Sequence, residues 1–167
     1  GFTEVMKQLP EDEEDYGEVL KKVGMVLLSK VGGASGPLYG TAYMKAGAAV
    51  KGKTSITLED AKAMLTEVIG GIKMRGKAVK GEKTMLDALE PALDALTKGM
   101  ENGDDAEACL NAMCEAAREG VEFTKTIRAT KGRASYLGDR SIGHQDPGAT
   151  SATITLEAIR DFYLENK

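Results

Sequence analysis

The chain has 167 residues, which is enough for one domain with a sizeable hydrophobic core but too few for two comfortable domains. Hydrophobic residues make up 42% and charged residues 29%, which is the balance of an ordinary globular protein. Because the net charge is −4, we expect neither a nucleic acid nor an anionic membrane as a partner. No apolar run reaches the roughly 18 residues that a membrane-spanning helix needs.

Helical periodicity dominates the chain, and no segment alternates as a strand would. Seven helices are predicted, at residues 2–9, 16–31, 38–50, 58–75, 84–100, 105–129 and 149–166. Thr57 is expected to cap the fourth helix, and Thr150 or Ser151 the last. The pattern predicts an all-α fold of the up-and-down antiparallel type, and it does not distinguish a bundle from a closed helical barrel.

The two cysteines, Cys109 and Cys114, lie five positions apart within a predicted helix. Their number and spacing fit neither a disulfide framework, nor a C-x-x-C redox motif, nor a zinc site. We therefore expect reduced thiols in or near the core, as is typical of a cytoplasmic protein.

Glycine and polar residues concentrate in three loops. The first, GGASGP at residues 32–37, leads into a helix. Its glycines let the backbone approach a ligand, and a helix start offers unpaired N–H groups to phosphate oxygens. The alternative is a plain helix–helix turn with Pro37 at the first helical position.

The second loop, residues 75–84, is basic and also precedes a helix. A solvated connector and a phosphate-binding loop explain this composition equally well. Met85, at the following helix start, could offer a soft apolar surface to a flat ring such as a purine.

The third segment, residues 131–148, shows no helical period and holds two arginines, two aspartates and the only histidine. Unstructured segments of this length are uncommon in compact domains unless they serve a function. Arginine provides a charged planar fork that suits phosphate. For His144 a structural hydrogen bond is favoured over catalysis, because no serine or cysteine nucleophile is arranged around it.

These loops carry a family resemblance. The segments KVGGASGPLYGTA, RGKAVKGEKTMLD and KGRASYLGDRSIGHQDPGATS resemble, in order, those of the nucleotide-binding L subunit of dihydroxyacetone kinases. The similarity extends over essentially the whole chain, so residues 1–167 are expected to form a single L domain. It implies a barrel of eight antiparallel helices, with a nucleotide held by loops at one end.

The resemblance also implies which residues contact ADP. These are Ala34, Ser35, Gly76, Met85, Arg133, Asp146, Pro147 and Gly148. Met85 is expected to pack against adenine, and Ser35 and Arg133 to lie near the phosphates. Arg133 is also the expected catalytic residue, because it would stabilise charge in the transition state.

One part of the family pattern is missing. In the family, an Asp-rich motif that binds two magnesium ions lies on a segment immediately before the position of Gly1, together with the first helix. Its absence explains why about seven helices are predicted where the family has eight, and no metal ligand is assigned within residues 1–167. Either a shortened chain or a disordered segment explains the missing motif. We favour a disordered segment that becomes ordered when magnesium and nucleotide bind.

The resemblance implies a phosphotransferase subunit with bound ADP as cofactor. A phosphohistidine of an M subunit converts the ADP to ATP, and the γ-phosphoryl then passes to dihydroxyacetone on a K subunit. The length of the chain favours this phosphoenolpyruvate-fed system over an ATP-fed kinase, in which the same domain is fused to a K domain. Two different functions stay open: a non-catalytic interaction module that contacts a partner such as a transcriptional regulator, and a phosphocarrier that uses His144.

Overall fold

The structure is a computed structural model that describes all residues from Gly1 to Lys167. It is entirely helical, which confirms the predicted all-α class. The chain divides into two compact units, Gly1–Lys77 and Ala78–Lys167, called here the first and the second unit. No helix is both long and apolar enough to cross a membrane.

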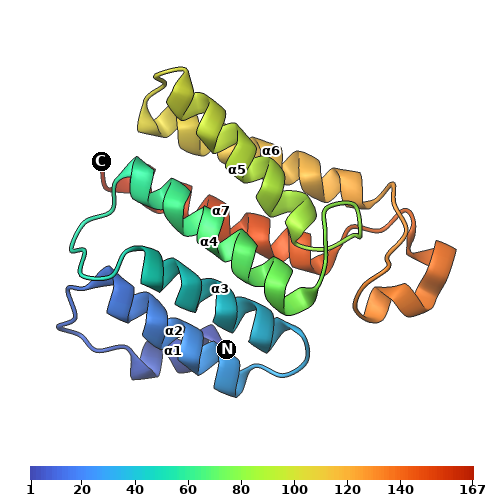
Figure 1. Ribbon diagram of the computed structural model, residues 1–167, viewed down its shortest axis with the longest axis horizontal. Helices are drawn as coiled ribbons and strands as arrows, with labels where there is room; N and C mark the ends of the chain where they lie inside the picture. Colours follow the sequence, from blue (N-terminus) through green and yellow to red (C-terminus); the bar gives the residue numbers. More distant parts are fainter. The chain divides into compact units, whose positions relative to one another are not determined.

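The first unit holds four helices. They are α1 (Phe2–Gln8), α2 (Tyr16–Lys30), α3 (Ser35–Ala49) and α4 (Leu58–Gly76). Within this unit, α2, α3 and α4 lie side by side and successive helices run in opposite directions (Figure 1). Thr57 caps α4 through a capping box with Asp60, as predicted.

Glycines set how closely the helices of the first unit approach. A Cβ on Gly24 of α2 would lie 2.7 Å from the carbonyl oxygen of Gly40, and one on Gly47 of α3 would lie 2.6 Å from that of Gly17. Backbone therefore packs directly on backbone between α2 and α3. Gly71 of α4 packs against the side chains of Thr41 and Lys45 of α3, so α3 is packed on two sides.

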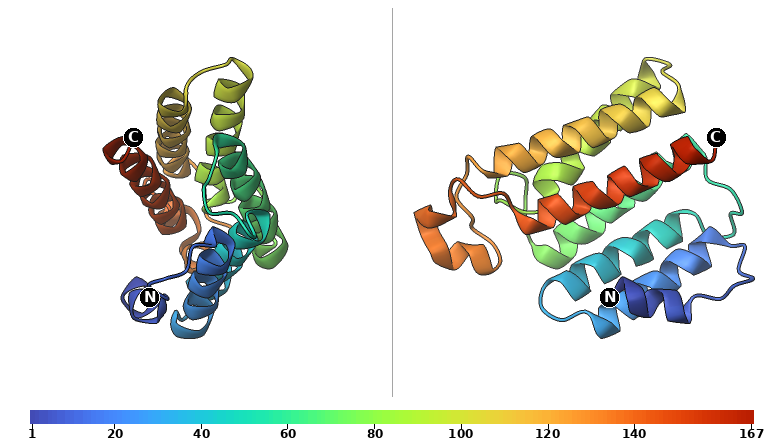
Figure 2. Two further views of the ribbon diagram at one scale, coloured as in Figure 1. Left: turned by 90° about the vertical axis from the view of Figure 1, so that its left-hand side faces the viewer. Right: turned by 180° about the vertical axis from the view of Figure 1, so that it is seen from behind.

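The second unit holds three α-helices and one 3-10 helix. They are α5 (Leu86–Glu101), α6 (Ala106–Thr124), η1 (Arg133–Ser141) and α7 (Pro147–Glu165). Helix α7 lies beside both α5 and α6, and η1 projects from one end of these three helices (Figure 2). Gly120 allows α5 and α6 to touch, because a Cβ there would lie 2.0 Å from the carbonyl oxygen of Asp87.

Both cysteines lie in α6 as buried free thiols, as expected. Burial raises the pKa of the Cys109 thiol and of the Cys114 thiol. Such thiols are protonated and unreactive at neutral pH, which is consistent with a role in packing.

Two helix boundaries differ from the predicted ones by three residues or more. Helix α3 begins at Ser35 rather than at residue 38, because Pro37 is tolerated in a first helical turn that needs no N–H from it. Helix α6 ends at Thr124 rather than at residue 129, where the β-branched Thr126 and Ile127 disfavour further helix.

The prediction that segment 131–148 contains no helix is wrong. Nine of its residues form η1, which is interrupted at Gly138 by a non-helical conformation with φ 57° and ψ −131°. A short 3-10 helix does not produce apolar residues at a 3.6-residue period, so the sequence pattern could not reveal η1.

Candidate functional site

The first glycine-rich loop makes a tight turn from α2 into α3. Gly33 has a φ of 69°, and a Cβ on Gly36 would lie 2.0 Å from the carbonyl oxygen of Val31. The positive φ favours glycine at Gly33, and the close contact requires glycine at Gly36, so the loop folds back onto the end of α2. Ala34 and Ser35 are exposed on this turn.

The start of α3 differs from most other long helices of the chain. Its N-cap residue, Ala34, makes no side-chain capping hydrogen bond, and its first turn contains no acidic residue. In contrast, aspartate or threonine side chains cap α2, α4, α6 and α7. The exposed start of α3 therefore keeps the positive end of its helix dipole free of carboxylates, which suits an anionic ligand.

Gly76 lies beside this helix start. It is the last residue of α4, and a Cβ on it would lie 3.3 Å from Cδ2 of Leu38 in the first turn of α3. Lys77 follows with the left-handed φ of 48° that turns the chain out of α4. The first unit thus gathers the predicted residues Ala34, Ser35 and Gly76 at one of its ends.

In the second unit, the starts of α5 and α7 are neighbours. A Cβ on Gly148 of α7 would lie 3.5 Å from the backbone nitrogen of Met85 and 3.6 Å from its Cβ. Met85 is the N-cap residue of α5 and is only 5% exposed. The structure therefore brings Met85 and Gly148 together, and it leaves only a narrow part of the methionine open to a ring.

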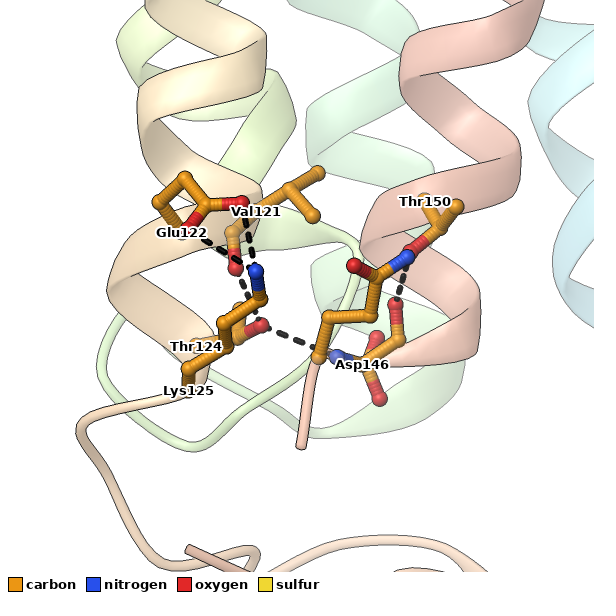
Figure 3. A network of polar contacts seen from close by, with 7 residues as sticks. Val121, Glu122, Thr124, Lys125, Asp146 and Thr150 are labelled. Atoms are coloured by element: carbon orange, nitrogen blue, oxygen red, sulfur yellow. Dashed lines mark hydrogen bonds and ion pairs between the residues drawn. The ribbon is translucent and has the colours of Figure 1, made fainter. Parts of the chain in front are cut away.

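Asp146 caps α7, so the predicted caps Thr150 and Ser151 were wrong. Its carboxylate accepts a hydrogen bond from the backbone N–H of Ala149 at 2.7 Å, and Pro147 occupies the first helical position. The backbone N–H of Asp146 donates to Thr124 Oγ1 at 2.9 Å (Figure 3). The caps were misplaced because the helix was predicted to begin at residue 149, whereas it begins at Pro147.

Asp146 is a buried carboxyl group with an altered acidity. Burial raises its pKa above the ordinary value, and the negative charge of Asp87 acts in the same direction. The backbone hydrogen bonds at the start of α7 and the positive charge of Lys83 act in the opposite direction. Three ionisable side chains therefore influence one another below the start of α7.

Arg133 and His144 lie on the surface of the segment between α6 and α7. Arg133 is the first residue of η1 and is exposed, after a Gly132 with a φ of 64°. Its guanidinium is therefore accessible to a phosphate, although no contact joins it to Asp146 or Met85. His144 is exposed on the chain that leads back towards α7.

Sequence analysis missed the buried polar residues beneath these loops. Lys83, Asp87, Thr124 and Ser141 are all buried in the second unit. By composition, Lys83 belongs with the lysines of a basic, solvated loop. Its neighbours in the sequence give no sign that it is buried.

Comparison with known proteins places the chain in a family. The model of the DAK2 domain matches residues 1–161. The ADP-binding subunit DhaL of the PEP-dependent dihydroxyacetone kinase of Escherichia coli is 44% identical over 160 residues, which cover 95% of this chain and 76% of that protein. The ADP-binding subunit DhaL of the PTS-dependent kinase of Lactococcus lactis is 40% identical over 162 residues, covering 95% and 75%.

Longer proteins contain a similar region. The human triokinase/FMN cyclase is 36% identical over 142 residues, which cover 85% of this chain and 24% of that protein. The crystal structure of the dihydroxyacetone kinase of C. freundii matches with a TM-score of 0.66 and 26% identity, covering 93% of this chain and 25% of that one. On the evidence of the matched domain and of these relatives, the chain belongs to the DAK2 domain family.

Proposed function

We propose that this protein is the ADP-binding subunit of a phosphoenolpyruvate-dependent dihydroxyacetone kinase. The observation that carries the proposal is the contact between the starts of α5 and α7, where Met85 and Gly148 lie against each other. Both residues belong to the set that the family resemblance assigns to the nucleotide. Relatives named as ADP-binding subunits match over about three quarters of their own length, which supports the same role here.

The described residues fit an adenine nucleotide in three respects. The uncapped start of α3 offers N–H groups and the Ser35 hydroxyl, and Arg133 offers an exposed guanidinium. The rigid start of α7, fixed by Asp146, supports Pro147 and Gly148. Following the resemblance, we propose as ADP contacts Ala34, Ser35, Gly76, Met85, Arg133 and Asp146 to Gly148.

Bound ADP would supply an acceptor, and after its phosphorylation a donor, for one phosphoryl group. The residues of this chain would orient the nucleotide and absorb charge as the phosphoryl group moves, and none has to act as a nucleophile. Arg133 is the residue that we assign to charge stabilisation. We further propose that a phosphohistidine-bearing M subunit and a dihydroxyacetone-binding K subunit are the two partners, in the cytoplasm.

We propose magnesium as a cofactor only on the basis of the family resemblance. Residues 1–167 contain no group of three or more histidine, cysteine, aspartate or glutamate side chains placed to hold a metal ion. They do not fit the magnesium site of the family, whose ligands belong to a segment before Gly1.

Titration with a fluorescent ADP analogue in the presence of Mg²⁺ tests the proposal. Arg133→Ala should weaken binding by roughly 10- to 100-fold, as loss of a charge-assisted hydrogen bond does. The matched control is Arg140→Ala, which removes another exposed arginine of η1 and should change the affinity less than twofold. Absence of ADP binding by the wild type would overturn the proposal and leave a nucleotide-independent interaction module. Equal losses in both variants would remove the specific role of Arg133.

A further inference from the structure

Lys83 combines two unfavourable features. Its side chain is 3% exposed, whereas lysines are almost never fully buried unless they are paired. Its backbone is in the left-handed region with a φ of 61°, which only one other non-glycine residue, Lys77, shares. Features that cost stability persist where the surrounding structure depends on them, so the contacts of Lys83 indicate what it does.

The ammonium group of Lys83 joins two distant points of the backbone. Its Nζ donates to the carbonyl oxygen of Ser141 at 2.5 Å and to that of Ile127 at 3.3 Å. These two carbonyl groups flank residues 128–140, which include η1 and therefore Arg133. A single buried charge thus holds both ends of the projecting segment.

Neighbouring contacts close the same segment. Ser141 Oγ accepts from the backbone N–H of Ala129 at 2.9 Å and donates to the carbonyl oxygen of Gly138 at 2.7 Å. Glu82, next to Lys83, accepts a hydrogen bond from the hydroxyl of Thr130 at 3.2 Å. The base of the segment is therefore fixed from residues 82 and 83, while the surface that carries Arg133 remains free.

The same ammonium group is coupled to the start of α7. Burial raises the pKa of Asp146 and the charge of Asp87 acts in the same direction, whereas the positive charge of Lys83 acts in the opposite direction. Asp87 is fully buried and accepts hydrogen bonds from the backbone N–H groups of Gly81 at 2.5 Å and Thr84 at 2.9 Å. Lys83 is thus a buried cation whose charge acts on Asp146, the residue that caps α7.

We infer that Lys83 is a positioning residue for the nucleotide: it holds segment 128–140, and with it Arg133 on η1, in one fixed arrangement. This inference rests on the proposed function, since it takes Arg133 as a residue of an ADP site. Lys83 itself is not expected to contact the ligand, because its side chain is only 3% exposed. Its removal should release the segment 128–140 and thereby weaken nucleotide binding.

Two measurements on Lys83→Met in the full chain test this inference. Binding of a fluorescent ADP analogue should weaken by about tenfold or more, the factor that corresponds to about 1.4 kcal/mol. Hydrogen exchange of the unliganded protein should become faster in residues 128–140 and stay unchanged in the first half of α6. The matched control is Lys98→Met, an exposed lysine of α5, which should alter neither quantity.

A rescue experiment separates positioning from general damage. Lys83→Ala leaves space for propylammonium, which should restore slow exchange in residues 128–140 and ADP affinity, whereas uncharged 1-propanol should not. If Lys83→Met does not fold, Ser141→Ala serves as the second variant. It removes the hydroxyl that holds Ala129 and Gly138, so it should also speed exchange and weaken binding.

The possible failures are distinguishable. Wild-type affinity in Lys83→Met, or weaker binding without faster exchange, overturns the positioning role. Failure of the wild type to bind ADP overturns the proposed function. The exchange measurements on the unliganded protein would then show only whether Lys83 holds the segment, and the inference about the nucleotide would fall as well.

Discussion

The hydroxyl of Thr124 accepts a hydrogen bond from the backbone N–H of Asp146 at 2.9 Å, and both residues are buried (Figure 3). Thr124 is the last residue of α6, and Asp146 is the N-cap of α7. The same hydroxyl donates to the carbonyl oxygen of Val121 at 2.6 Å. The side chain of Thr124 thus links the end of α6 to the start of α7 and fixes the start of α7.

Thr124→Val should destabilise the protein by about 1–3 kcal/mol, the cost of a buried N–H group without an acceptor. Valine has the shape of threonine, so packing changes little while the hydrogen bond to Asp146 is lost. We also expect weaker ADP binding, because the start of α7 loses its anchor. Urea unfolding and ADP titration measure the two effects.

Thr126→Val is the matched control for this experiment. Thr126 makes the same kind of bond, from its hydroxyl to the carbonyl oxygen of Phe123 at 2.8 Å, but it is exposed. Its replacement should change stability by less than about 0.5 kcal/mol, as is usual for surface positions. Equal effects of the two substitutions would show that the bond to Asp146 contributes nothing.

The sequence predicted the helices well because apolar periodicity and caps are local signals. The capping box at Thr57 and the approximate extents of α2 and α4 depend only on neighbouring residues, and they were found. The start of α7 was misplaced because Thr150 or Ser151 was predicted to cap it. Asp146 is the cap, and Pro147 is the first helical residue.

The candidate site was only partly accessible from the sequence. The resemblance named residues of loops, and in the structure Met85 and Gly148 are neighbours. It could not indicate that Lys83 is buried, since the carbonyl groups that its ammonium binds lie 44 and 58 residues further along the chain. Every residue has a backbone carbonyl group, so hydrogen bonds to these groups do not require particular side chains. No sequence motif could therefore have revealed them.

The carboxyl group of Asp146 should make stability fall as pH rises. Its pKa is raised by burial, so the folded protein binds this proton more tightly than the unfolded chain does. Its contribution is therefore fully present below the ordinary value of 3.8 and is lost as pH rises through the higher folded value. Asp146→Asn keeps an oxygen for the N–H of Ala149, and it should remove this dependence.

Urea unfolding of the wild type and of Asp146→Asn across this pH range measures the effect. The unfolding free energy of the wild type, relative to that of the variant, should decrease with rising pH. Asp94→Asn, an exposed aspartate of α5, should parallel the wild type. An unchanged difference at every pH would contradict the raised pKa of Asp146.

Asp60 should show the opposite dependence. Its hydrogen bond with Lys53, at 2.7 Å, is the largest cause that lowers its pKa to about 2 from 3.8. The stabilisation is present above 3.8 and is lost as pH falls through about 2. The stability advantage of the wild type over Asp60→Asn should therefore shrink on acidification. Lys53→Met, measured by the same urea unfolding, should remove most of that pH dependence. A pH-independent difference between the wild type and Asp60→Asn would show that the carboxylate is not stabilised by its charge.

Gly36→Ala should disrupt the turn that presents Ser35. Its methyl group would lie 2.0 Å from the carbonyl oxygen of Val31, a backbone atom that cannot rotate away. The start of α3 must then shift, so we expect a loss of stability of about 1–3 kcal/mol together with weaker ADP binding.

The control is Gly70→Ala in α4 of the same unit, where a methyl group meets no atom within 4 Å. Alanine favours a helix over glycine by about 1 kcal/mol, so Gly70→Ala should raise the melting temperature and leave ADP affinity unchanged. If Gly36→Ala bound ADP as the wild type does, the start of α3 would not be part of the nucleotide site.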